Sequence, residues 1–272
     1  MSKIPKDAHA IIIGAMKSGT TSFYNYLIEH PQICASLEKE PEFFSEHQEH
    51  GTELENYQEL WNFDSELHKY ALEASTGYTK YPVEKNVAKN IYQYDIQPKL
   101  IYIVRNPFDR IESHFNFMQT NKSWEFNITD KYLINISRYN LQLDQYQKYF
   151  PKNSILVLDF AELKNNPQFL LKKTYDFLEL SEYVYPTEYS ISNRTESISK
   201  IEHKVKKMKS FIPDVPFILK IGRGMKNFLR KTNPQTKKRI TDFEKEFIYR
   251  QLKDDMEKLN KNYGIDVSKW GF

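Results

Sequence analysis

A strand-like run followed by glycines, a lysine and three hydroxyl residues is the part of this 272-residue sequence best suited to chemistry. Residues 10–27 read AIIIGAMKSGTTSFYNYL, so that an apolar run ends at Gly14 and a helical pattern follows the loop. In a strand, loop and helix of this kind, the loop N–H groups and the helix N-terminus converge and favour an anion. The residues predicted to form this cradle are Lys17, Ser18, Gly19, Thr20, Thr21 and Ser22.

The order of residues in the loop indicates which kind of anion it would bind. Gly14 and Gly19 have the spacing of the nucleoside triphosphate motif G-x-x-x-x-G-K-[ST], but Thr20 stands where that motif has its lysine. Lys17 lies inside the loop instead, so its ammonium approaches the bound group from another side. The loop is predicted to be a variant of the Walker loop in which the lysine lies before the second glycine, at Lys17, and not directly after it.

A second cluster follows the apolar run at residues 100–104, in the sequence RNPFDRIESHF. Arg105 is predicted to stand at the carboxyl end of a parallel strand, and Ser113 lies eight residues later, about two helical turns along. A strand that feeds an NTPase metal site would end in Asp, whereas a guanidinium fork favours a second phosphate. The alternative for Arg105 is a structural ion pair with Asp109 or Glu112.

Two carboxylates follow a short predicted strand at residues 32–36. Glu40 and Glu42 precede Phe43 and Phe44 in LEKEPEFFSE, and a carboxylate backed by aromatics is well placed to act as a partly desolvated base. The alternative is a surface loop pinned by two phenylalanines, and the residues alone leave both open.

The elements that must position these groups alternate along the chain. Apolar runs that predict strands lie at residues 10–13, 32–36, 69–75, 100–104 and 154–158. Helical patterns follow Thr20 and recur at residues 51–63, 84–94, 107–119, 131–150, 166–178 and 241–263. The pattern predicts an α/β fold with a P-loop-like central parallel β-sheet of about five strands, flanked by helices and followed by a helical C-terminal region.

Length and patterning predict one domain over residues 1–272. Within it, residues 8–180 are expected to form the α/β nucleotide-binding core and residues 181–240 a basic lid or loop and helical region. Residues 241–272 are expected to form the closing helix.

The net charge of +3 is unevenly distributed. Residues 200–239 hold 13 Lys and Arg against two acids, so the rest of the chain sums to −8. Such a block is most often a solvated helical face, but it can also contact an anionic cofactor or, peripherally, a membrane surface.

Cys34 is the single cysteine, which excludes an intrachain disulfide framework, and it is expected to be buried and not a nucleophile. The first residues resemble no secretory signal, and no window reaches the ~20 apolar residues that span a bilayer. A soluble, cytoplasmic protein is therefore expected.

Taken together, the two clusters resemble the sulfotransferases that use 3′-phosphoadenosine 5′-phosphosulfate, PAPS. GAMKSGTTS is similar to the 5′-phosphosulfate loop of that family, and RNPFDRIESHF to its 3′-phosphate segment. The two motifs occur in order, about 90 residues apart, each after an apolar strand. The likeness extends over LIEHPQI, KEPEFF and the closing helix, and is greatest to the bacterial and carbohydrate-type branch, including heparan-sulfate-type domains.

The resemblance implies sulfuryl transfer from PAPS, with PAP as product and no metal, to a hydroxyl or amine of an acceptor. Glu40 matches the glutamate that acts as general base in an E-x-x-F-F motif, and Lys17 is placed to neutralise the bridging oxygen. Arg105 and Ser113 would bind the 3′-phosphate. The family's basic loop over that phosphate has no clean match, and its candidates are Arg194, Lys200 and Arg223.

One departure concerns the acceptor. Several glycan-modifying members carry Lys after the glutamate of an E-K-x-P segment, where this chain has Ala74 after Glu73. A substrate-side cation is missing, so a heparan-like polyanion is a less favoured acceptor than a small metabolite or a glycan or lipid precursor. No nucleic-acid partner is expected.

Two other functions compete with sulfuryl transfer. A P-loop kinase or NTPase is favoured by the glycine spacing and by SILVLDF at residues 154–160, which resembles a Walker B strand ending in Asp159. A plain capping turn also explains Asp159. The other competitor is a non-catalytic binding or membrane-surface protein built around residues 200–239.

Overall fold

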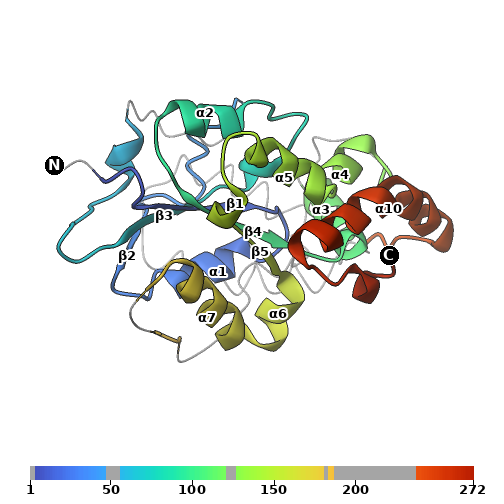
Figure 1. Ribbon diagram of the computed structural model, residues 1–272. Coiled ribbons are helices and arrows are strands. Elements are labelled where there is room, and N and C mark those ends of the chain that lie inside the picture. The colour runs from blue at the N-terminus through green and yellow to red at the C-terminus, as the bar shows by residue number, and fades with distance from the viewer. Residues whose placement is uncertain (1–3, 47–55, 121–126, 181–182, 187–236) are drawn as a thin grey trace, which may run out of the picture.

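A five-stranded, wholly parallel sheet forms the centre of the protein in the computed structural model, which describes residues 4–46, 56–120, 127–180, 183–186 and 237–272 (Figure 1). The strand order is β2-β3-β1-β4-β5. The strands are β1 His9–Gly14, β2 Ile33–Ala35, β3 Tyr70–Ala74, β4 Lys99–Val104 and β5 Ile155–Asp159. The predicted α/β fold with about five parallel strands is confirmed.

Helices cover both faces of this sheet (Figure 1). The α-helices are α1 Thr20–Leu27, α2 Val87–Gln93, α3 Pro107–Thr120, α4 Lys131–Ile136, α5 Tyr139–Gln147, α6 Phe160–Asn165, α7 Pro167–Phe177 and α10 Asp242–Tyr263. Short 3₁₀-helices are η1 Tyr57–Leu60, η2 Thr76–Thr79, η3 Lys152–Ser154 and η5 Val267–Trp270. Figure 1 shows α2 and α5 on one side of the sheet and α1, α6 and α7 on the other.

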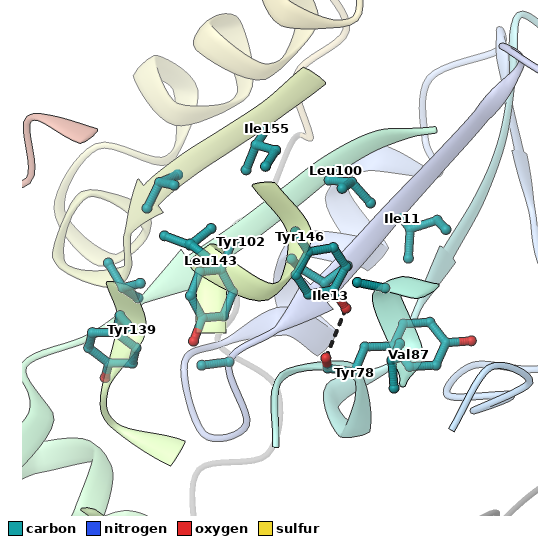
Figure 2. Packing of buried hydrophobic residues seen from close by; sticks show 14 of the residues in the cluster. Ile11, Ile13, Tyr78, Val87, Leu100, Tyr102, Tyr139, Leu143, Tyr146 and Ile155 are labelled. Atoms are coloured by element: carbon teal, nitrogen blue, oxygen red, sulfur yellow. Dashed lines mark hydrogen bonds between the residues drawn. The ribbon is translucent and has the colours of Figure 1, made fainter. Parts of the chain in front are cut away.

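The alternation of side chains along the strands divides the core into two clusters. Ile11 and Tyr102 face the cluster that includes α5 residues, whereas Ile12 and Ile101 face the cluster that includes α1 and α7 residues. Figure 2 shows the first cluster, in which the Tyr146 hydroxyl donates a 2.8 Å hydrogen bond to the Tyr78 carbonyl. Burial on both faces explains why the strands read as continuous apolar runs.

Helix α10 belongs to the first cluster. Thr241 and Glu244 form a capping box at its start, as the Thr and Glu spacing favours. Its buried residues are Ile248, Leu252, Met256 and Leu259. The Asp255 carboxylate accepts hydrogen bonds from the N–H groups of Asn140 at 3.0 Å and Leu141 at 2.9 Å, so α10 caps the N-terminus of α5.

Two helix predictions were wrong. Residues 131–150 form two helices, α4 and α5, because the chain turns at Ser137 and Arg138, where the Ser137 hydroxyl donates to the Leu133 carbonyl. Residues 51–63 were predicted as a helix, but their described part holds only η1, after which Trp61 is extended. Apolar periodicity continues across both breaks, so it could not show them.

The carboxyl ends of the strands meet at one edge of the sheet, where the candidate residues gather. β1 lies between β3 and β4, and the strand order reverses there, which is the place where open α/β sheets bind ligands. Cys34 is buried, as expected. In the described part of the chain, no helix combines the length and the apolar character needed to cross a membrane.

Candidate functional site

The loop after β1, residues 14–22, is called the glycine loop here. Its Ala15 N–H donates to the Ile103 carbonyl of β4 at 2.8 Å, which fixes the loop beside the neighbouring strand. Gly19 has φ +80°, and a Cβ there would lie 2.5 Å from the Phe160 ring, so the position requires glycine. Gly19 is the N-cap of α1 and offers no side-chain cap, which leaves the helix N-terminus suited to an anion.

Lys17 lies over this loop in a partly desolvated position. Its ammonium is 4.4 Å from the centroid of the Phe117 ring of α3. Burial, and after it the Arg105 and Lys237 charges, lower the pKa of Lys17 against the opposing Glu40 charge, and together these effects bring the pKa to about 8. The Lys17 charge is therefore poorly solvated, and its role at the anion site stays a prediction.

Arg105 follows β4 and joins the two motifs. Its Nη1 donates to the Lys17 carbonyl at 3.0 Å, and its guanidinium lies 5.0 Å from the centroid of the Phe160 ring. The alternative ion pair is also present, since Nη2 is 3.6 Å from the Asp109 carboxylate, which is 59% exposed. Within the described chain the buried Nε has no hydrogen-bond partner.

Ser113 lies on α3, four residues after Asp109 and four before Phe117, on one face of the helix. These two neighbours contact Arg105 and Lys17, so the predicted sharing of one crevice fits this face. Ser18 is fully buried, and its hydroxyl has no hydrogen-bond partner among the described residues. Unpaired buried donors at this edge fit an anionic ligand.

The turn after β2, residues 36–46, is called the acidic turn here. Its Glu40 has φ +62° and its N–H donates to the Ala74 carbonyl at 3.0 Å. Lys39 lies 2.5 Å from Oε1, and the Thr76 hydroxyl donates to Oε2 at 3.2 Å. The side chain is 33% exposed, so a partly desolvated carboxylate lies at the same strand ends as Lys17.

Glu42 has a different environment from Glu40. It is buried and accepts hydrogen bonds from the Gly77 N–H at 2.7 Å and the Ser45 hydroxyl at 2.6 Å. Burial raises the pKa of Glu42. The structure therefore gives the two carboxylates different surroundings: Glu40 is partly exposed at the strand ends, and Glu42 is buried and holds the acidic turn.

Several residues of the site were not found from the sequence. Phe117, Phe160 and Thr76 contact Lys17, Arg105 and Glu40 across long sequence separations, and no local signal marks them. Glu73 is an exception, because a carboxylate inside an apolar strand is itself a signal. The basic-loop candidates Arg194, Lys200 and Arg223, with most of residues 200–239, lie outside the described residues.

Asp159, the acid that favoured an NTPase, caps the helix that follows it. Asp159 is the N-cap of α6, and its Oδ1 accepts from the Ala161 N–H at 2.8 Å, as the capping alternative predicted. The residues after the cap form the short helix α6 and not only a turn. No group of three or more His, Cys, Asp or Glu side chains in the described ranges is arranged to hold a metal ion.

Comparison with known proteins places this geometry among sulfotransferases. Residues 7–260 match the family profile described as "Sulfotransferase domain". Human heparan sulfate glucosamine 3-O-sulfotransferase 5 is 27% identical over 197 residues, which are 66% of this chain and 55% of that protein. The membrane-associated sulfotransferase kil1 of Dictyostelium discoideum is 33% identical over 133 residues, 46% of this chain and 26% of that protein. The chain thus matches only about a quarter to a half of these relatives.

A solved structure gives the same result for the fold. The sulfotransferase from Alicyclobacillus acidocaldarius superimposes with a TM-score of 0.68 and 18% sequence identity, and covers 100% of both chains. At that identity the likeness supports the fold alone.

Proposed function

This chain belongs to the sulfotransferase domain family, and we propose that it moves a sulfuryl group from PAPS to a hydroxyl or amine of an acceptor. The observation that carries the proposal is the meeting of two cations at one uncapped helix N-terminus. Arg105 Nη1 donates a 3.0 Å hydrogen bond to the main-chain carbonyl of Lys17, and α1 begins at Thr20, just after Lys17, without a side-chain cap. A Walker-type site has a single lysine after the second glycine, a position that Thr20 holds here.

The donor groups at the site fit a nucleotide with two phosphates. The N–H groups from Ser18 to Thr21 and the hydroxyl of Ser18 would hold the 5′-phosphosulfate. Arg105 after β4 and Ser113 on α3 would hold the 3′-phosphate. When bound, PAPS supplies the sulfuryl group and the ADP-like leaving group.

Two side chains would carry the chemistry. As the acceptor oxygen or nitrogen bonds to sulfur, Glu40 takes the acceptor proton. As the bond from sulfur to the bridging oxygen breaks, Lys17 neutralises the charge that develops on that oxygen. The Lys39 ammonium and the Thr76 hydroxyl fix the Glu40 carboxylate in place for this task.

The acceptor is proposed to be a glycan or a small metabolite. The match to heparan sulfate glucosamine 3-O-sulfotransferase 5 supports a sugar acceptor. Ala74 is fully buried and supplies no cation to the acceptor side, which favours an acceptor with less charge than heparan sulfate. A cytoplasmic location stays a prediction from the sequence.

Nucleotide binding tests the donor assignment first. Calorimetry with PAP and with ATP should show PAP as the tighter ligand, and Arg105→Ala should weaken PAP by roughly 1.5 to 3 kcal/mol, as expected for charge-assisted contacts. Arg250→Ala, an exposed arginine of α10 paired with Glu246, is the matched control. Tighter binding of ATP than PAP, or unchanged PAP affinity in Arg105→Ala, would contradict the assignment.

Turnover tests the base. With ³⁵S-labelled PAPS and a panel of sugars, amines and phenols, Glu40→Gln should lose turnover while PAP affinity stays within about threefold. Glu38→Gln changes an exposed acid two residues away and should leave turnover as in the wild type. Activity should persist in EDTA. Normal turnover in Glu40→Gln would remove Glu40 as the base.

A further inference from the structure

The acidic turn is fastened to the sheet by hydroxyl groups and not only by backbone pairing. The Glu42 N–H donates to the Ser75 hydroxyl at 3.1 Å, and the Phe44 N–H donates to the Tyr78 hydroxyl at 3.2 Å. Ser75 follows β3, and Tyr78 lies in η2. These two amides of the turn, Glu42 and Phe44, therefore depend on side chains more than 30 residues later in the chain.

Both hydroxyls in turn donate hydrogen bonds to one carboxylate, that of Glu73. The Ser75 hydroxyl donates to Glu73 Oε2 at 2.7 Å, and the Tyr78 hydroxyl donates to Glu73 Oε1 at 3.1 Å. A hydroxyl has one proton, so donation to Glu73 turns its lone pairs toward the amides of the turn. Each chain runs in one direction, from amide to hydroxyl to carboxylate, and polarises cooperatively.

Water cannot replace these bonds. Glu73 and Ser75 are 0% exposed, and Tyr78, Phe44 and Glu42 are each at most 6% exposed. A buried amide left without an acceptor costs about 1–3 kcal/mol. The backbone also needs holding, because Glu40 and Glu42 have φ +62° and +50°, a region that L-residues other than Asn and Asp rarely adopt.

We infer that Glu73 is a positioning residue for Glu40, and that it acts through two hydroxyl relays, Ser75 and Tyr78, that hold the acidic turn. The inference rests on the proposed role of Glu40 as base. Glu40 lies two residues before the first relay contact, and its own N–H pairs with Ala74, the residue after Glu73. Loosening the relays frees the turn and moves the Glu40 carboxylate away from the acceptor.

A third hydroxyl on Glu73 supplies a matched control. Tyr57 donates to the same Oε1 at 2.6 Å, but no amide of the acidic turn donates to it in the described chain. Tyr57→Phe keeps the ring, which packs 4.6 Å from the Phe44 ring centroid, and removes one bond to Glu73. The variant therefore removes one hydrogen bond to the Glu73 carboxylate and leaves the Ser75 and Tyr78 relays intact.

Amide hydrogen exchange measured by NMR tests the relays without any acceptor. Ser75→Ala should speed exchange of the Glu42 amide about tenfold, and Tyr78→Phe should do the same for the Phe44 amide. Tyr57→Phe should leave both amides protected. Wild-type exchange at Glu42 in Ser75→Ala and at Phe44 in Tyr78→Phe would overturn the inference.

Kinetics test the effect on the base. Ser75→Ala and Tyr78→Phe should each lower kcat about fivefold to fiftyfold with PAP affinity within about twofold, and the double variant should lower it further. Tyr57→Phe should keep kcat within about twofold at a comparable loss of stability. Faster exchange with unchanged kcat would overturn the positioning role. If Glu40→Gln turns over normally, the proposed base fails, whereas an inactive Glu40→Gln beside fully active relay variants refutes the inference alone.

Discussion

The glycine loop and the acidic turn lie at the same edge of the sheet but are held in different ways. The glycine loop is fixed mainly by its backbone: a Cβ at Gly14 or Gly19 would collide, and the Ala15 N–H donates to the Ile103 carbonyl of β4, with one side-chain bond from Arg105. The acidic turn is fixed by two buried hydroxyls, those of Ser75 after β3 and Tyr78 in η2, which accept from its amides, and by the Gly77 N–H, which donates to Glu42. The loop presents poorly solvated cations, and the turn presents a carboxylate whose two oxygens are already bonded.

Because different residues support the two regions, changes to these supports should affect nucleotide binding and catalysis separately. A change beneath the glycine loop should alter nucleotide affinity, because the loop carries the anion site. A change beneath the acidic turn should alter turnover at constant nucleotide affinity, because only Glu40 is displaced. Substitutions in the two regions probe this division, from the largest expected effect to the smallest.

Lys17→Met should produce the largest loss. Removing one charge that stabilises a developing oxyanion lowers kcat by roughly 10²- to 10³-fold. The measurement is kcat and KM with labelled PAPS. Lys172→Met, in an exposed pair with Asp176 on α7, is the control and should retain wild-type rates. A fall in affinity alone, with kcat unchanged, would limit Lys17 to binding.

Gly77→Ala should break the acidic turn by collision. A Cβ at Gly77 would lie 2.0 Å from Glu42 Oε2, so the Glu42 bond to the Gly77 N–H cannot persist. We expect a loss of about 2–4 kcal/mol in the free energy of unfolding, measured in urea. Gly264→Ala is the control: it has φ +69° but open space around the Cβ, and should cost about 1 kcal/mol. Equal losses would show that Glu42 moves aside freely.

Glu73→Gln should change how stability depends on pH. Burial raises the pKa of Glu73 from 4.5 to about 7, so between these values the folded state holds a proton that the unfolded state has lost. Wild-type stability therefore falls as pH rises through this window, by about 3 kcal/mol, and the variant lacks that fall. Urea unfolding of both proteins at pH 4.5, 6 and 8 measures it; parallel pH profiles would contradict the prediction.

The glycine loop should respond in another window and with the opposite sign. Because the pKa of Lys17 is lowered from 10.5 to about 8, its destabilisation is complete below pH 8 and is relieved as pH rises toward 10.5. The difference between wild type and Lys17→Met should thus change only above pH 8.

A pair of threonines in η2 gives the smallest and most selective effect. Thr76 donates to Glu40 Oε2, and Thr79 donates at 2.9 Å to the carbonyl of Ile13, directly beneath the glycine loop. Thr76→Val should lower kcat and Thr79→Val should weaken PAP binding, each by about 1 kcal/mol. Steady-state kinetics and calorimetry measure kcat and PAP affinity for both variants. If both variants change the same quantity, or each changes the one expected of the other, the distinction between the two regions fails.

The same contrast explains what the sequence could predict. The glycine loop, Arg105 and Ser113 could be proposed as one site because each motif is local and the parallel strands bring their carboxyl ends to one edge. Glu40 was placed correctly after β2, but its supports were not, because the register of β2 on β3 brings Thr76 to it across 36 residues. The break between α4 and α5 was missed because it depends on hydrogen bonds at Ser137 and not on a change in apolar periodicity.

The cap that Asp255 places on α5 has a practical meaning for anyone who reshapes this protein. α10 supplies both the carboxylate for two amides of α5 and four buried apolar side chains. A version shortened before α10 would uncover the α5 side of the sheet and leave those amides unpaired. We therefore expect such a truncation to be insoluble or protease-sensitive, with α10 behaving as an integral part of the folding unit and not as a removable appendage.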